Sequence, residues 1–193
     1  MRQVSHADTG SVRVLAVLVL AFVGFWGWQE HRLRANEKRL ARVASEVARR
    51  PVGISCPGLF TRLVEITPNS GWVDFDADGR PAAKAWLNAE TCSRLERFHG
   101  SEIDVPTAKA LLVLAHESFH VAGVKSEAQT QCYAVQAVEF VARRLGATPE
   151  EARATARWAA VASPSFTPPD YWYAPACRDG GIWDLRPGST VWP

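Results

Sequence analysis

The chain has 193 residues, of which 47% are hydrophobic and eight are tryptophan. This composition suits one folded domain of ordinary size and excludes a chain that is disordered throughout. The formal net charge is only +2, and Lys and Arg concentrate before residue 51 with no basic stripe interleaved with aromatic residues after it. A nucleic-acid partner is therefore not expected.

The N-terminal region contains an uncharged, mostly apolar run over residues 14–28. With its flanking residues the run approaches the thickness of a bilayer's hydrocarbon core, and Trp26 and Trp28 stand where interfacial aromatic residues are expected. We expect residues 1–11 to form a tail and residues 12–28 to form a single transmembrane anchor. A cleaved signal peptide and a buried core helix are the alternatives.

Residues 29–51 are rich in charge and in good helix formers, and they predict a charged helical stalk. Pro51 and Gly53 end this segment, so the folded domain is expected over residues 52–193. The basic flank after the apolar run favours a cytoplasmic domain by the positive-inside rule.

Four cysteines lie in this domain, without a CxxC pair. Their even number favours two disulfides in an oxidising compartment, which places the domain outside the cell membrane in spite of the flanking charge. Three pairings can be drawn, and we favour Cys56–Cys92 with Cys132–Cys177. Four buried free thiols are the alternative.

The pattern between residues 56 and 87 is extended and predicts a small β-hairpin with a turn at residues 76–79. The acidic string Asp74, Asp76 and Asp78 resembles the start of a calcium-binding EF-hand loop. Calcium is not expected, because Ala85 stands where such a loop requires a glutamate.

Four helices are predicted after the hairpin from their capping and stop residues, over about residues 88–99, 105–122, 126–145 and 148–162. From about residue 164 the chain is rich in proline and aromatic residues without a helical period, which indicates a surface tail pinned by Cys177. The expected fold is mostly α with a small β-hairpin element, in the α+β class, behind one N-terminal transmembrane helix.

The second of these helices carries HESFH, residues 116–120, in an uncharged setting. Residues four apart share one face of a helix, so His116 and His120 can bind one metal ion, while Glu117 can reach a metal-bound water. Glu127 is the candidate third ligand, because a tight helical hairpin brings the first turn of the next helix beside the histidines. Two His and one Glu leave one zinc position open, as a catalytic site requires.

Other readings of these residues remain open. Glu127 would also suit a helix dipole as a first-turn acid. Cys132 could serve as a soft metal ligand in place of a disulfide partner.

The segment from HESFH to EAQTQCYA (residues 127–134) resembles the zincin metallopeptidases, in particular bacterial neutral zinc metallopeptidases whose HExxH helix is followed by ELQADCYA. The resemblance implies a zincin-like helical core and Zn²⁺ as the cofactor. It also implies that His116, His120 and Glu127 are the metal ligands and that Glu117 is the catalytic glutamate. The spacing from the second histidine to the glutamate is shorter than in that pattern. Thr130 and Gln131 replace its Ala and Asp.

The sequence thus predicts a membrane-anchored zinc metallopeptidase that acts on a peptide or protein substrate, with Glu117 as general base. Candidates for a further donor to the oxyanion are Tyr171, Tyr173 and His99. A non-catalytic, membrane-tethered binding or regulatory module is the alternative, and an ordinary buried helix with two satisfied histidines is the third hypothesis. The pattern indicates no oligomeric state, and it leaves open whether the tail covers the cleft.

Overall fold

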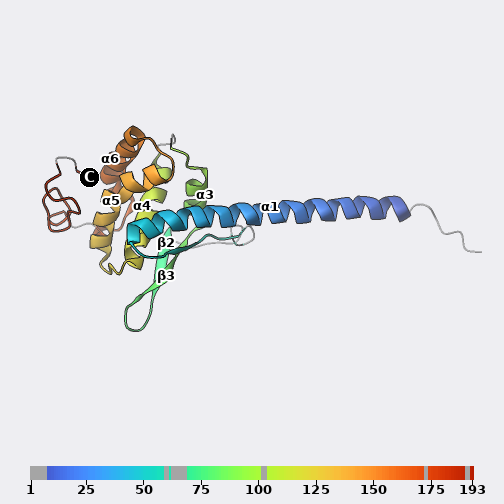
Figure 1. Cartoon of the computed structure of the whole chain (residues 1–193), viewed down its shortest axis with the longest axis horizontal. Helices are drawn as coiled ribbons and strands as arrows, with labels where there is room; N and C mark the ends of the chain where they lie inside the picture. Colours follow the sequence, from blue (N-terminus) through green and yellow to red (C-terminus); the bar gives the residue numbers. More distant parts are fainter. Residues whose placement is uncertain (1–7, 59–60, 62–68, 101–103, 172–173, 190–191) are drawn as a thin grey trace, which may run out of the picture. The chain divides into compact units, whose positions relative to one another are not determined.

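Two compact units make up the chain, Met1–Ala35 and Asn36–Pro193. This computed structural model describes residues 8–58, 61, 69–100, 104–171, 174–189 and 192–193. These residues are mostly helical, with one small three-stranded sheet and one long, apolar N-terminal helix (Figure 1). The expected class, a mostly α protein with a small β element, is confirmed at this level.

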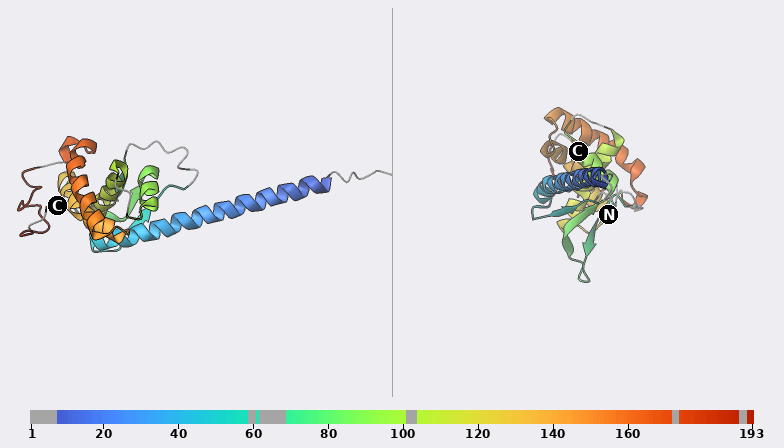
Figure 2. Two further views of the ribbon diagram at one scale, coloured as in Figure 1. Left: turned by 90° about the horizontal axis from the view of Figure 1, so that it is seen from above. Right: turned by 90° about the vertical axis from the view of Figure 1, so that its right-hand side faces the viewer.

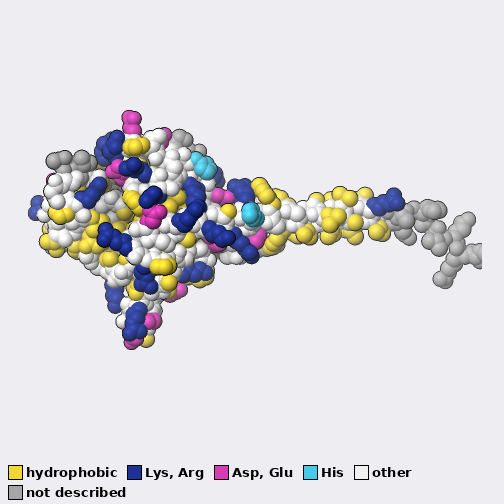
Figure 3. Space-filling model, in the orientation of Figure 1, with side chains coloured by type: hydrophobic (Ala, Val, Ile, Leu, Met, Phe, Trp, Pro, Cys, Tyr) yellow, Lys and Arg dark blue, Asp and Glu magenta, His cyan; other side chains and the backbone are white. Residues whose placement is uncertain are grey.

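The first unit contains the apolar part of helix α1 (Asp8–Ala48). From Val12 to Phe25 its large hydrophobic side chains are at least half exposed, and Figure 3 shows them covering the visible face of this part of the helix. The helix is long and apolar enough to span a membrane. Residues 12–28 alone cover about 25 Å of helix, against a hydrocarbon core of about 30 Å.

The second unit begins within α1, because the residues from Asn36 onward pack into the folded body. Leu40 and Ala44 are fully buried. The guanidinium of Arg39 donates hydrogen bonds to three backbone carbonyls of this body, those of Leu95, Phe98 and Leu145. The latter part of residues 29–51, expected as a charged helical stalk, therefore contributes to the hydrophobic core.

The sheet has three strands in the order β1-β3-β2, with bounds β1 (Gly53–Ser55), β2 (Gly71–Phe75) and β3 (Pro81–Leu87). β2 and β3 pair antiparallel, as the predicted hairpin requires, with Trp72 opposite Trp86. β1 adds in parallel to the other side of β3. Local pattern did not predict this strand, because a parallel pair joins segments that are distant in sequence. β2 is left at an edge of the described sheet.

The helices after the sheet are α3 (Ala89–Arg97), α4 (Val105–Val121), α5 (Glu127–Arg144) and α6 (Pro149–Phe166). Each follows a residue whose side chain accepts a hydrogen bond from the first turn, at Asn88, Asp104, Ser126 and Thr148. These caps confirm the predicted starts. α6 continues past its predicted end near residue 162, because the amide and hydroxyl of Thr167 both donate to the carbonyl of Ser163 and hold the last turn despite Pro164.

α4 is the central helix of the second unit. Twelve of its seventeen residues are buried, and it packs against α3, α5, α6 and the strands β2 and β3. The tip of the β2–β3 hairpin projects away from these helices (Figures 1 and 2). A helix buried on nearly all sides holds its polar residues in a low-dielectric setting, so each of them needs a partner or a function.

Two disulfides cross-link this unit, Cys56–Cys92 and Cys132–Cys177. Both favoured pairings are confirmed. The second disulfide ties the C-terminal tail to α5, where the side chain of Gln136 donates to the carbonyl of Trp183 and accepts from the amide of Leu185. The tail is therefore pinned to the folded unit, as the position of Cys177 predicted.

Replacing Leu40 with alanine tests whether the end of α1 is part of the core. Because Leu40 is 0% exposed, Leu40→Ala should lower the free energy of unfolding by about 2–5 kcal/mol. The exposed neighbour Lys38 provides the control, and Lys38→Ala should change it by no more than about 0.5 kcal/mol. Urea unfolding of the full-length protein in detergent micelles, followed by near-UV circular dichroism, measures both. Equal, small effects would mean that this part of α1 is solvated.

Candidate metal centre

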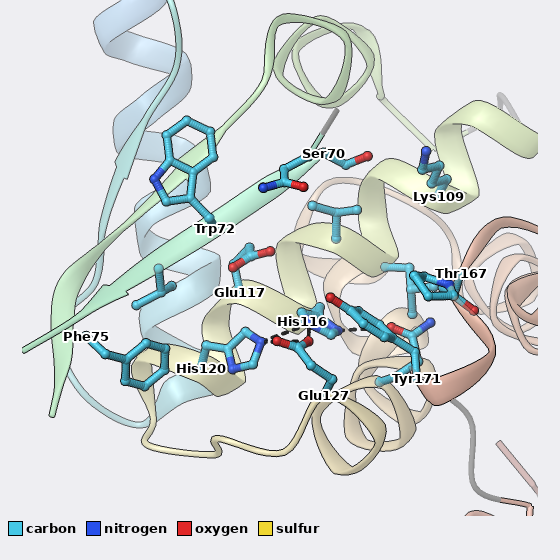
Figure 4. A pocket seen from close by; sticks show the side chains of 17 residues that line it. Ser70, Trp72, Phe75, Lys109, His116, Glu117, His120, Glu127, Thr167 and Tyr171 are labelled. Atoms are coloured by element: carbon cyan, nitrogen blue, oxygen red, sulfur yellow. Dashed lines mark hydrogen bonds and ion pairs between the residues drawn. The ribbon is translucent and has the colours of Figure 1, made fainter. Parts of the chain in front are cut away.

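The two histidines of HESFH and the glutamate that opens α5 meet at one point (Figure 4). Nε2 of His116 lies 2.9 Å from Nε2 of His120 and 2.9 Å from Oε2 of Glu127, and Nε2 of His120 lies 3.2 Å from the same oxygen. The three residues are close enough to hold one metal ion. A tetrahedral zinc ion with bonds of about 2.0–2.1 Å separates its N and O ligands by about 3.3 Å, so this spacing fits one ion.

The opposite ring nitrogens have hydrogen-bond partners that favour one tautomer. Nδ1 of His120 lies 2.7 Å from the carbonyl oxygen of Val124, and Nδ1 of His116 lies 3.0 Å from Oε1 of Gln131. Because both partners are acceptors, they suit the tautomer in which Nδ1 carries the proton and Nε2 carries the lone pair that binds a metal ion. In that tautomer Nε2 of both histidines and the carboxylate of Glu127 would bind one ion together.

The helical hairpin predicted from the sequence brings these residues together. His116 and His120 lie one turn apart on α4 and are both buried. Gly123 has a φ of 101°, a conformation that suits glycine, and it turns the chain out of α4. Ser126 then caps α5 and makes Glu127 its first residue, within reach of both imidazoles.

Glu117 lies beside this cluster and faces the same cavity (Figure 4). Its side chain is buried, and Oε2 has no hydrogen-bond partner among the described residues. Burial raises the pKa of this carboxyl to about 8. β2 packs closely against it, since a Cβ on Gly71 would lie 2.9 Å from Oε1 of Glu117. A larger residue at position 71 would therefore collide with the side chain of Glu117.

The electrostatics of the cluster keep Glu127 ionised. Burial alone would raise the pKa of Glu127, but the hydrogen bonds to His116 and His120 hold it well below its usual range. Burial would lower the pKa of His120, but the contacts with Glu127 and the Val124 carbonyl raise it. A carboxylate that stays ionised is the form that binds a cation.

Tyr171 is the one expected oxyanion donor that the structure places at the site. It belongs to the short helix η1 (Pro169–Tyr171), and its ring stacks on that of His116 with centroids 5.7 Å apart. Burial and the nearby Glu127 carboxylate raise the pKa of its phenol to about 12, so the hydroxyl keeps its proton. His99 is exposed and does not line the cavity, and Tyr173 lies outside the described residues. Cys132 is not a metal ligand, because it forms a disulfide.

The site opens into a pocket of about 440 Å³. β2 forms one wall, α4 another, and the segment after α6 a third (Figure 4). The residues that line it are Asn69, Ser70, Gly71, Trp72, Val73, Phe75, Lys109, Leu112, Val113, His116, Glu117, His120, Glu127, Gln131, Thr167, Pro168 and Tyr171. A cavity of this size accommodates a few residues of a ligand rather than an ion alone.

Sequence reasoning missed the residues that support the cluster from behind. Gln131 was noted only as a departure from the family pattern, yet its carbonyl faces His116 and its amide donates to Oγ of Ser163 over 2.7 Å. Its position four residues after Glu127, on the same face of α5, was the available signal. Ser163 carries no local signal, since it comes from α6.

No protein-family model, curated protein or solved structure matches this chain. The resemblance to zincin metallopeptidases therefore remains an expectation that rests on residues 116–134. The chemistry of the site is inferred from its own residues and their geometry.

Removing either kind of ligand should abolish metal binding. The full-length protein should bind about one zinc ion per chain at neutral pH, whereas His116→Ala and Glu127→Ala should bind far less. His99→Ala, an exposed histidine outside the pocket, should behave as the wild type. Elemental analysis after dialysis against zinc and then buffer measures the stoichiometry. The protein used must include residues 36–48, because a fragment that begins at residue 52 would lack the buried residues of α1.

Gln131 should affect the affinity for the metal ion through its contact with His116, although it is not itself a ligand. Gln131→Leu removes the acceptor for the Nδ1 proton of His116, and should weaken zinc binding by about 10- to 100-fold. Gln131→Glu keeps an acceptor at the same place and should bind zinc at least as tightly as the wild type. Competition with a chromogenic chelator gives both affinities. Equal weakening by the two variants would show that Gln131 acts through packing.

Proposed function

We propose that this chain is a membrane-anchored, zinc-dependent metallopeptidase with a zincin-like helical core. The observation that carries the proposal is the convergence of two imidazole Nε2 atoms and one ionised carboxylate in a pocket. Two His and one Glu form a ligand set typical of catalytic zinc, because a tetrahedral ion keeps its fourth position for water or substrate. His116, His120 and Glu127 would hold the ion.

A peptide is the substrate that the walls of the pocket favour. β2 is an edge strand of the described sheet, and its residues from Gly71 to Val73 line the cavity. An edge strand offers unpaired backbone groups, to which an extended peptide can add as a further strand. A peptide bound in this way would run past the cluster on α4.

Glu117 has the environment of a general base for the hydrolysis of that peptide. When bound, zinc would supply Lewis-acid chemistry and lower the pKa of a water molecule at the site. Glu117 would accept the proton of the attacking water and return it to the leaving amine. Its Oε2 has no hydrogen-bond partner among the described residues, so no internal hydrogen bond competes for that role. Tyr171 would donate a hydrogen bond to the carbonyl oxygen as negative charge develops there.

The proposed location is the cell membrane, with α1 as a single-pass anchor and the second unit outside the cytoplasm. α1 is long and apolar enough for the span. Both described disulfides lie in the second unit, and such bonds persist in oxidising compartments. The positively charged flank of the apolar run opposes this orientation only weakly, since large domains translocate in spite of flanking charge.

Glu117→Gln separates a peptidase from a binding module. The substitution should lower kcat/KM for quenched fluorescent peptides by about 10²- to 10⁴-fold, because it removes the proton acceptor, while zinc content stays at the wild-type level. The matched control is Glu90→Gln, an exposed residue of α3 outside the pocket, which should leave hydrolysis unchanged.

The assay uses the full-length protein in detergent micelles loaded with zinc, and chelation followed by zinc addition should stop and restore hydrolysis. Wild-type protein that holds zinc and cleaves no member of a broad peptide library would contradict the proposal. It would instead favour a membrane-tethered binding or regulatory module.

A further inference from the structure

Lys109 lines the pocket at the end away from the His116/His120/Glu127 cluster (Figure 4). It lies on the same face of α4 as Val113 and His116, one and two turns before them, and its side chain is half-buried in the pocket wall. Figure 4 shows Lys109 at one end of the pocket and Phe75 at the other, with His116 between them. The pocket therefore has an aromatic end and a cationic end.

No described carboxylate lies within salt-bridge distance of the Lys109 amine, although Arg94, Arg80 and Arg144 each pair with a carboxylate. Ser70 and Thr167, which are uncharged, line the same part of the pocket (Figure 4). Lys109 therefore lines the cavity without a counter-ion from the described residues.

A bound metal ion would not offset the positive charge of Lys109. Of the three ligands His116, His120 and Glu127, one is a carboxylate, which carries less charge than a divalent cation. Lys109 is the only lysine or arginine among the described residues that line the pocket. The positive charge at this end of the loaded pocket would attract an anionic ligand.

We propose that Lys109 binds a carboxylate of the substrate and thereby selects acidic peptides. This inference rests on the proposed function and adds the substrate class to it. Lys109 and His116 are seven residues apart, which is about 10 Å along the helix axis. An extended peptide advances about 3.3 Å per residue, so the selected carboxylate lies about three residues from the bond that is cleaved. The carboxylate belongs to an Asp or Glu side chain or to the free C-terminus of the peptide.

A matched peptide series tests the preference. Each peptide carries one glutamate, moved position by position along a neutral sequence, and is compared with its glutamine counterpart and with free and amidated C-termini. The wild type should prefer the carboxylate by about 10- to 100-fold in kcat/KM at a position about three residues from the cleaved bond. A preference that amidation removes identifies the C-terminus as the source, and one that Glu-to-Gln exchange removes identifies the side chain.

Variants of Lys109 show whether this residue carries the preference. Lys109→Met and Lys109→Gln should abolish it, and Lys109→Glu should transfer it to peptides with lysine at the same position. Lys38→Met removes an equal charge from an exposed site outside the pocket and should change nothing. Zinc content and unfolding temperature identify any variant that fails to fold. Wild-type preference retained in both Lys109→Met and Lys109→Gln overturns the proposal.

Binding separates this inference from the proposed function. Fluorescence anisotropy with the same peptides and zinc-loaded Glu117→Gln protein should show the carboxylate preference without turnover. If the wild type hydrolyses no peptide but this preference is present and depends on Lys109, the proposed function is wrong and the role of Lys109 in binding a carboxylate is supported. If hydrolysis occurs and neither measurement shows a carboxylate preference, the role of Lys109 is wrong and the proposed function is supported.

Discussion

The second unit is organised around three potential metal ligands that point at one another. Nε2 of His116, Nε2 of His120 and Oε2 of Glu127 lie 2.9–3.2 Å apart. On the far side of the rings, the carbonyl of Val124 and the side chain of Gln131 offer acceptors to the two Nδ1 atoms. A low-dielectric setting strengthens the attraction between the ionised Glu127 and a cation. Positive charge at the centre of the cluster therefore stabilises the arrangement.

The surrounding fold supplies this arrangement from three helices and opens it on one side. α4 provides both histidines and Glu117 from its buried face, while α5 provides Glu127 and Gln131, and Ser163 of α6 holds the amide of Gln131 in place. The sheet closes the site from the other direction, where Gly71 lets β2 pack against α4 without displacing the glutamate. Helices and strands thus fix the clustered side chains, and the open side leads to the pocket.

The two parts of helix α1 differ in the exposure of their apolar side chains. In its first part large apolar side chains are exposed, as for a helix solvated by lipid. In its last part the apolar residues Leu40, Val43 and Ala44 are buried, and Arg39 satisfies three carbonyls of the folded unit. The many charges of residues 29–51 conceal this change in the sequence, because an amphipathic helix and a solvated stalk share a similar composition.

The sequence alone determined the features that depend on short-range rules. The helix caps at Asn88, Ser126 and Thr148 act within a few residues, so the sequence predicts where the helices start. The histidines lie one turn apart and Gly123 turns the chain just after them, so the sequence also predicts that the candidate metal ligands converge. The sequence left three disulfide pairings possible, and the structure forms the two bonds of the favoured one.

Only the tertiary structure decided which distant segments support the site. The parallel strand β1, the contact of Gly71 with Glu117, the link from Gln131 to Ser163 and the place of Lys109 in the pocket all join residues whose partners lie far away in sequence or on another element. Such contacts depend on how the helices and strands pack against one another, and the local periodicity of the sequence does not show which elements pack together. The convergence of His116, His120 and Glu127 could therefore be predicted from the sequence, whereas the shape and charge of the pocket around them could not.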